Sequence, residues 1–139
     1  MHHIVMACLC LALGFCEHAT EPATQKIGVE FELKYKESAQ IEQGEKFTIT
    51  YKDLLEDSRC PIGVECVWAG NAKVLLRIAE RDSSVNTTLE PKQTTHLGGD
   101  GTRYTVQLLA VTPYPVYGVT MKKEETKIRL IVTTDNQDR

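Results

Sequence analysis

Residues 46–52 read KFTITYK, and this stretch decides the fold class of the chain. Its apolar side chains, Phe47, Ile49 and Tyr51, alternate with lysine and threonine. Successive side chains of a β-strand point to opposite faces of the sheet, so this period of two predicts a strand with one dry and one wet face. Such a strand is typical of an antiparallel sheet that covers a core on one side.

The same alternation recurs along the chain. Clear strands are predicted at residues 27–35, 46–52, 73–79, 103–108 and 127–133, and weaker ones at 39–42, 85–89 and 116–121. Residues 53–57 (DLLED) are the one candidate for a helical turn. We therefore predict an all-β fold, an antiparallel two-sheet sandwich of about seven or eight strands, Ig-like in architecture, with one local disulfide loop.

Length and composition favour a single globular domain. The chain has 139 residues, of which 42% are hydrophobic and 25% charged. We place the domain at residues 27–134 and a C-terminal tail at 135–139. The net charge of −3, without a basic cluster, argues against nucleic-acid binding.

The N-terminal segment indicates export. Residues 4–15 (IVMACLCLALGF) form an uncharged apolar run that is shorter than the roughly 20 residues needed to span a bilayer. This predicts a signal peptide over residues 1–15 that is removed on export, although no lysine or arginine precedes the apolar run. Ordinary secretion with another cleavage site and an uncleaved membrane helix remain alternatives.

Cys16 is a candidate for lipidation. It follows Leu13-Gly14-Phe15, which resembles a bacterial lipobox, except that a small residue is usual where Phe15 stands. Residues 16–26 would then be a flexible linker that tethers the domain to a membrane. We expect the protein in the cell envelope as a lipoprotein, or secreted or periplasmic.

Residues 57–70 read DSRCPIGVECVWAG and lie in a long connection between two clear strands. Of the five cysteines, Cys8 and Cys10 leave with the signal peptide and Cys16 is the lipidation candidate, so Cys60 and Cys66 are the natural disulfide pair. The small ring that they close is worth about 2 kcal/mol in the loop-entropy model.

Two interpretations of this loop are open. It is either a structural staple with Trp68 packed into the core beneath it, which we prefer, or a rigid loop that meets a partner. The binding-loop candidates are Ile62, Val64, Glu65 and Trp68.

The pattern DSRCP-x-x-x-x-C-x-W-A-G, followed by an alternating strand, resembles a family of small exported bacterial proteins, many of them classed as lipoproteins. The resemblance covers roughly residues 27–134 and includes the later stretch LLAVTPYP. It implies export and a disulfide, but no catalytic residue.

The sequence predicts no catalytic residue, metal ligand set or cofactor. His96 stands alone beside a glycine turn, where an exposed strand-end histidine is expected. The C-x5-C spacing does not suit zinc. The acids at positions 53, 56, 57 and 65 fit no calcium loop, and a solvated patch or a salt bridge to Arg59 is expected instead.

These observations predict an exported, membrane-tethered, non-catalytic binding or accessory domain. Its partner would be another envelope or extracellular protein, and it would meet the membrane only through the N-terminal lipid. A peptidase-inhibitor-like β-sandwich is the first alternative. A metal-binding or enzymatic envelope protein is the second, and a structural role in an envelope assembly is a further one.

Overall fold

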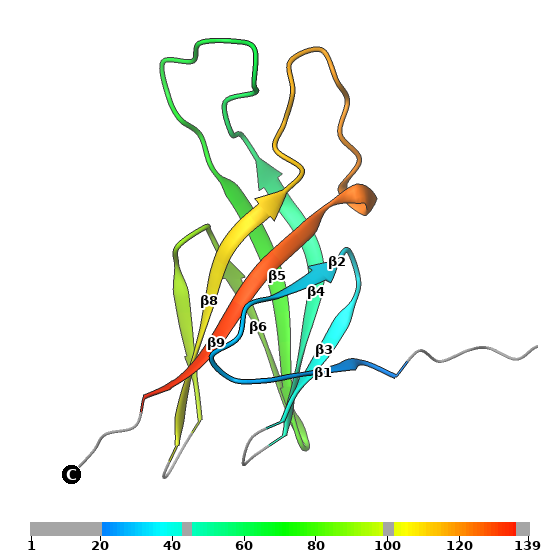
Figure 1. The fold of residues 1–139 in the computed structure, drawn as a ribbon, viewed down its shortest axis with the longest axis vertical. Helices are drawn as coiled ribbons and strands as arrows, with labels where there is room; N and C mark the ends of the chain where they lie inside the picture. The colour runs from blue at the N-terminus through cyan, green and yellow to red at the C-terminus, as the bar shows by residue number, and fades with distance from the viewer. Residues whose placement is uncertain (1–20, 43–45, 99–101, 136–139) are drawn as a thin grey trace, which may run out of the picture.

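The computed structural model describes residues 21–42, 46–98 and 102–135, which form two β-sheets packed face to face (Figure 1). The strands are β1 (Ala23–Gln25), β2 (Phe31–Lys34), β3 (Ser38–Ile41), β4 (Phe47–Asp57), β5 (Ala72–Glu80), β6 (Ser83–Leu89), β7 (Thr94–Leu97), β8 (Arg103–Thr112) and β9 (Lys127–Asp135). A 3-10 helix, η1 (Lys123–Glu125), precedes β9. The predicted all-β sandwich is therefore confirmed, with nine strands among the described residues instead of seven or eight.

One sheet has the strand order β1-β3-β4-β5-β6 and the other β2-β9-β8-β7. Neighbouring strands pair antiparallel, except that β1 runs parallel to β3. Strand β1 lies within residues 16–26, so the prediction of a flexible linker over this whole segment is wrong for residues 23–25. The predicted signal peptide (1–15) and Cys16 lie outside the described residues.

The core lies between the two sheets and is mainly aliphatic. Every second residue faces it in β5, in β9 and in the regular first parts of β4 (47–51) and β8 (104–108), which is the dry face that the alternation predicted. The hydroxyl of the buried Tyr51 lies 2.7 Å from the Oγ1 of Thr126, the residue just before β9 of the second sheet. Burial raises the pKa of Tyr51 above its ordinary value, so the phenol stays neutral in this contact.

Two strand predictions and one helical-turn prediction differ from the structure. The strand expected at residues 27–35 is shortened to β2, because Gly28 has a φ of +77° and Val29 is exposed. Residues 53–57 are not helical but continue β4, where two register shifts interrupt the alternation. Residues 116–121 form no strand, and their one bridge joins Val116 to Ile62.

Strand β9 extends to Asp135, one residue into the predicted tail. No helix in the described part of the chain has the length and apolar character to cross a membrane.

Candidate functional site

Two loops project from one end of the sandwich, beyond the ends of the strands (Figure 1). Residues 58–71 join β4 to β5, and residues 113–122 join β8 to η1. We call these two loops together the tip. They are tied by main-chain hydrogen bonds: the Ile62 amide donates to the Pro115 carbonyl (2.9 Å), and the Tyr117 amide donates to the Ile62 carbonyl (3.0 Å). The tip is therefore one joined unit.

The base of the first loop is closed like a hairpin. The Ser58 amide donates to the Asn71 carbonyl (2.7 Å), and the Cys60 amide donates to the Ala69 carbonyl (2.9 Å). Gly70 makes this closure possible, because a Cβ there would lie 1.7 Å from the Ser58 carbonyl oxygen. Its φ of +67° also lies in the left-handed region that glycine tolerates best.

The predicted disulfide between Cys60 and Cys66 is confirmed, with Cα atoms 5.8 Å apart. It closes residues 60–66 into a ring above the hairpin base. Pro61 limits the backbone of this ring further. The main-chain bonds of Ile62 to the second loop begin inside the ring, so the disulfide shapes the segment through which the two loops meet.

Arg59 fastens both loops to the sandwich. Its guanidinium donates from Nε and Nη2 to the two carboxylate oxygens of Asp57 (2.7 and 2.6 Å). It also donates to the Val111 carbonyl (2.6 Å) and to the Pro113 carbonyl (3.1 Å), at the start of the second loop. The guanidinium lies over the ring of Tyr114, 4.8 Å from its centroid. The expected salt bridge of Arg59 is thus present, and both partners are almost fully buried.

The predicted acidic cluster does not converge on one point. Asp57 is occupied by Arg59, and Glu56 pairs with Lys73 (3.4 Å). Glu65 is exposed on the tip. Across the described ranges, no group of three or more histidine, cysteine or acidic residues is arranged to hold a metal ion.

Asp53, on β4, holds η1 at the end of the second loop. Its carboxylate accepts a hydrogen bond from the Lys123 ammonium at 2.9 Å and another from the Tyr35 hydroxyl at 3.0 Å. The contact with Lys123 lowers the pKa of Asp53 below its ordinary value. This pair anchors η1, and with it the far end of the second loop.

The surface of the tip is apolar. Eight of the eleven large exposed apolar side chains in the described ranges lie on it. They are Ile62, Val64, Val67 and Trp68 from the first loop and Tyr114, Val116, Tyr117 and Val119 from the second. Val67 is 92% exposed and Trp68 is 82% exposed.

The interpretation of Trp68 as a core plug is therefore wrong. The loop stands clear of the sheets, and aliphatic side chains from both sheets fill the core beneath it. The four binding-loop candidates, Ile62, Val64, Glu65 and Trp68, are all exposed. Sequence reasoning missed the contribution of the second loop, although its uncharged run of two tyrosines and two valines was visible.

His96, the one histidine that the described ranges contain, lies exposed on β7. Its Nδ1 is 3.0 Å from the Thr105 hydroxyl, which in turn donates to Asp135 at 3.4 Å. In a hydrolytic triad the histidine stands between the nucleophile and the acid. Here the hydroxyl stands in the middle, so Asp135 cannot orient the imidazole as a base.

Comparisons with protein-family models, with curated proteins and with solved structures found no match to this chain. The resemblance to small exported bacterial proteins therefore stays a prediction.

Proposed function

We propose that this chain is an exported, non-catalytic binding domain that contacts an envelope or extracellular protein through the tip. In this proposal Cys16 carries a lipid that tethers the domain to a membrane, and the tip is the working surface. The observation that carries the proposal is the exposure of Trp68 on a loop that the disulfide and Arg59 hold in one shape.

Structural needs explain most of the motif in residues 57–70, but not Trp68. Asp57 and Arg59 form the buried ion pair, the cysteines close the ring, and Gly70 admits the close approach of Ser58. The indole is 82% exposed. Contiguous exposed apolar surface on a soluble protein commonly marks an interaction site, and tryptophan is among the residues that contribute most to binding.

The rigidity of the tip also favours binding. Association is opposed by the ordering of flexible loops and side chains, at about 0.5–1.5 kcal/mol for each immobilised side chain. The ring, the hairpin base and the Arg59 contacts order the backbone of the tip before any partner arrives. A large share of the apolar contact energy is then available for affinity.

Site-specific photo-crosslinking tests the proposal. The full chain would carry benzoylphenylalanine at Val67 or Val119 on the tip, or at the control position Val29, which is 54% exposed and outside the tip. After illumination in the organism that encodes the protein, mass spectrometry should identify the same envelope protein from both tip positions and not from Val29. Similar products from all three positions, or none from the tip, would contradict the proposal.

A second variant separates binding from folding. Trp68→Ala, in the chain with the crosslinker at Val119, should remove most of the crosslinked product, because loss of such a residue costs about 2 kcal/mol or more of binding energy. Its urea midpoint should match that of the parent, because the indole makes little contact with the core. Intact-mass analysis of the purified chain would show whether Cys16 is lipidated.

One observation favours a peptidase inhibitor as the second candidate. The two joined loops project together from one end, as a wedge that enters a cleft must do (Figure 1). A panel of cysteine and serine peptidases, assayed with micromolar protein, tests this function. It is rejected if none is slowed, and it is specific to the tip if Trp68→Ala abolishes the inhibition.

A further inference from the structure

The two sheets end in four edge strands, and β6 is the longest of them. Strands β1, β2 and β7 have three, four and four residues, whereas β6 has seven. Its sequence, SSVNTTL, contains neither charge nor proline, and its pairing with β5 runs without a register shift. Short length, charge, proline and bulges are the usual means of protecting a sheet edge from another strand. Strand β6 has none of these.

The outer edge of β6 offers a regular row of main-chain groups. Glu80 and Ser83 face each other across the two-residue turn that joins β5 to β6. In an antiparallel pair, alternate residues direct both main-chain groups to the same neighbour, so Ser84, Asn86 and Thr88 direct theirs outward. No strand in the described ranges pairs with this edge. Only another extended polypeptide complements such a row.

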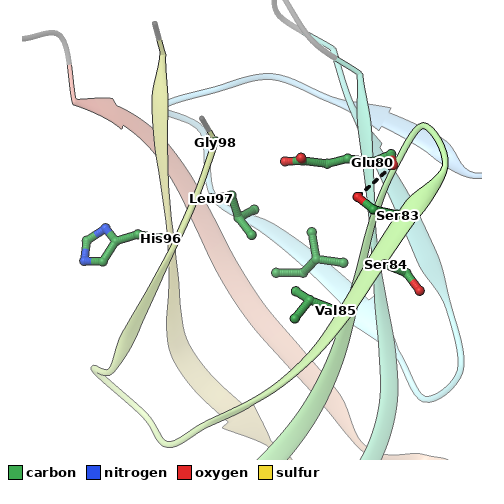
Figure 2. Close-up of a pocket in the computed structure, with 8 residues that line it drawn as sticks. Glu80, Ser83, Ser84, Val85, His96, Leu97 and Gly98 are labelled. Atoms are coloured by element: carbon green, nitrogen blue, oxygen red, sulfur yellow. Dashed lines mark hydrogen bonds between the residues drawn. The ribbon is translucent and has the colours of Figure 1, made fainter. Parts of the chain in front are cut away.

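A hollow lies beside β6, at the margin of the core. It lies between β6 and β7 and has a volume of about 290 Å³. Its lining combines the apolar Ile78, Val85 and Leu97 with polar side chains, which are Glu80, Ser83, Ser84 and His96. Val85 and Leu97 point into the space between the two strands (Figure 2). Val85 faces inward beside the buried Ile78 yet is 53% exposed. A strand added along β6 would cover the exposed side chain of Val85.

We propose that two copies of this chain pair antiparallel through β6 about a two-fold axis at Asn86. This register sets Asn86 opposite its own copy and Ser84 opposite Thr88, so that outward-facing residues meet each other. Residues near a two-fold axis meet their own copies, and like charges opposite each other are unfavourable. No residue from Ser83 to Leu89 is charged, so no like charges meet within the paired strands.

The pairing continues the five-stranded sheet of one copy into that of the other. Strand β6 starts at the end of the sandwich opposite the tip and runs towards the tip. Antiparallel pairing therefore places the two tips at opposite ends of the dimer, and both stay accessible. The dimer does not depend on the function proposed for the tip.

A charge-swap experiment tests the dimer. Light scattering would give the mass of the full chain over a range of concentrations, with Cys16→Ser in every sample so that no lipid contributes to the mass. Asn86→Glu faces Arg77 of β5 within one copy, which favours the fold, but sets two carboxylates opposite each other across the axis. Asn86→Lys sets two ammonium groups there instead.

The parent should show the mass of a dimer. For each variant alone, the dissociation constant of the dimer should rise by about tenfold or more. An equal mixture of the two variants should regain the dimer, because glutamate then meets lysine. Thr24→Glu, on the exposed edge strand β1 of the same sheet, should leave the dimer unchanged.

Thermal melting of each variant would show whether it is folded, and a melted variant would be replaced by Asn86→Asp. The proposal is overturned if the parent is a monomer at its highest soluble concentration, or if the Asn86→Glu variant dimerises as well as the parent. It is also overturned if the mixture stays monomeric while the parent is a dimer.

Discussion

Arg59→Ala should destabilise the domain strongly, because this side chain joins both loops of the tip to the sandwich. The change removes four side-chain hydrogen bonds, two to the Asp57 carboxylate and one each to the Val111 and Pro113 carbonyls. It also removes the contact with the Tyr114 ring. The carboxylate of Asp57, whose side chain is only 10% exposed, is left without its cation.

The size of the effect follows from this burial. Loss of one partner of a buried ion pair costs about 3–5 kcal/mol, because the other charge stays desolvated. We expect the lower end, about 3 kcal/mol, since an opened loop would admit water to Asp57. A domain of this size has a free energy of unfolding of about 5–15 kcal/mol, so the loss is a large fraction of it. At about 4 °C for each kcal/mol, the melting temperature should fall by about 12 °C.

Urea unfolding, followed by far-UV circular dichroism, would measure the change. The matched control is Arg129→Ala, which removes an exposed pair with Glu30 whose atoms are 3.6 Å apart and should cost less than about 1 kcal/mol. In a double-mutant cycle, adding Asp57→Ala to Arg59→Ala should recover about 2 kcal/mol relative to additivity, because no buried charge remains. If Arg59→Ala costs no more than Arg129→Ala, the role assigned to Arg59 is wrong.

Three further predictions concern the tip and its anchors. Gly70→Ala should lower the free energy of unfolding by more than about 2 kcal/mol, because its Cβ would overlap the Ser58 carbonyl group. Gly118→Ala, where the Cβ meets no neighbour, should lower it by about 1 kcal/mol because of the left-handed backbone. Equal urea midpoints for the two variants would contradict this. Replacing both Cys60 and Cys66 with alanine should cost about 2 kcal/mol and leave the far-UV spectrum unchanged, and loss of that spectrum would show that the disulfide supports more than its own loop. The lowered pKa of Asp53 means that its stabilising contribution is complete above the ordinary carboxyl pKa of about 3.9 and is lost as the pH falls through the lower folded-state value. Asp53→Asn should therefore reduce the urea midpoint at pH 7 and weaken its decline below about pH 4, and parallel pH profiles of parent and variant would refute this.

The alternation of apolar residues predicted most of the sandwich correctly, because its long strands have one face on the core. It failed where the alternation of apolar residues and the pairing of strands do not coincide. Residues 53–57 lose the alternation through bulges, yet they still pair with β5. Residues 116–121 have strand-like composition, but only Val116 meets another main chain in a bridge. A strand needs a neighbour, and local sequence does not identify that neighbour.

The tip was predictable only in part. The spacing and number of cysteines identified the disulfide, and the length of the connection identified a loop. The exposure of Trp68 could not be inferred, because large aromatic residues usually gain free energy from burial. The approach of the second loop depends on Arg59 reaching the Val111 and Pro113 carbonyls, more than 50 residues away in sequence. A contact between residues so far apart in sequence forms only in the folded chain, so the local sequence does not predict it.

Because Trp68 is exposed and Tyr51 and Tyr104 are buried, tryptophan fluorescence and tyrosine fluorescence report on different parts of the domain. Trp68 is the only tryptophan of the chain, and its indole is in water in the folded domain. Its emission should therefore change little when the sandwich unfolds, so a tryptophan-monitored denaturation curve would report almost nothing about global stability. The buried Tyr51 and Tyr104 report on the core instead. A shift of the indole emission to shorter wavelength would mean that a partner has covered the tip. The intrinsic fluorescence of the unlabelled protein therefore reports binding at the tip.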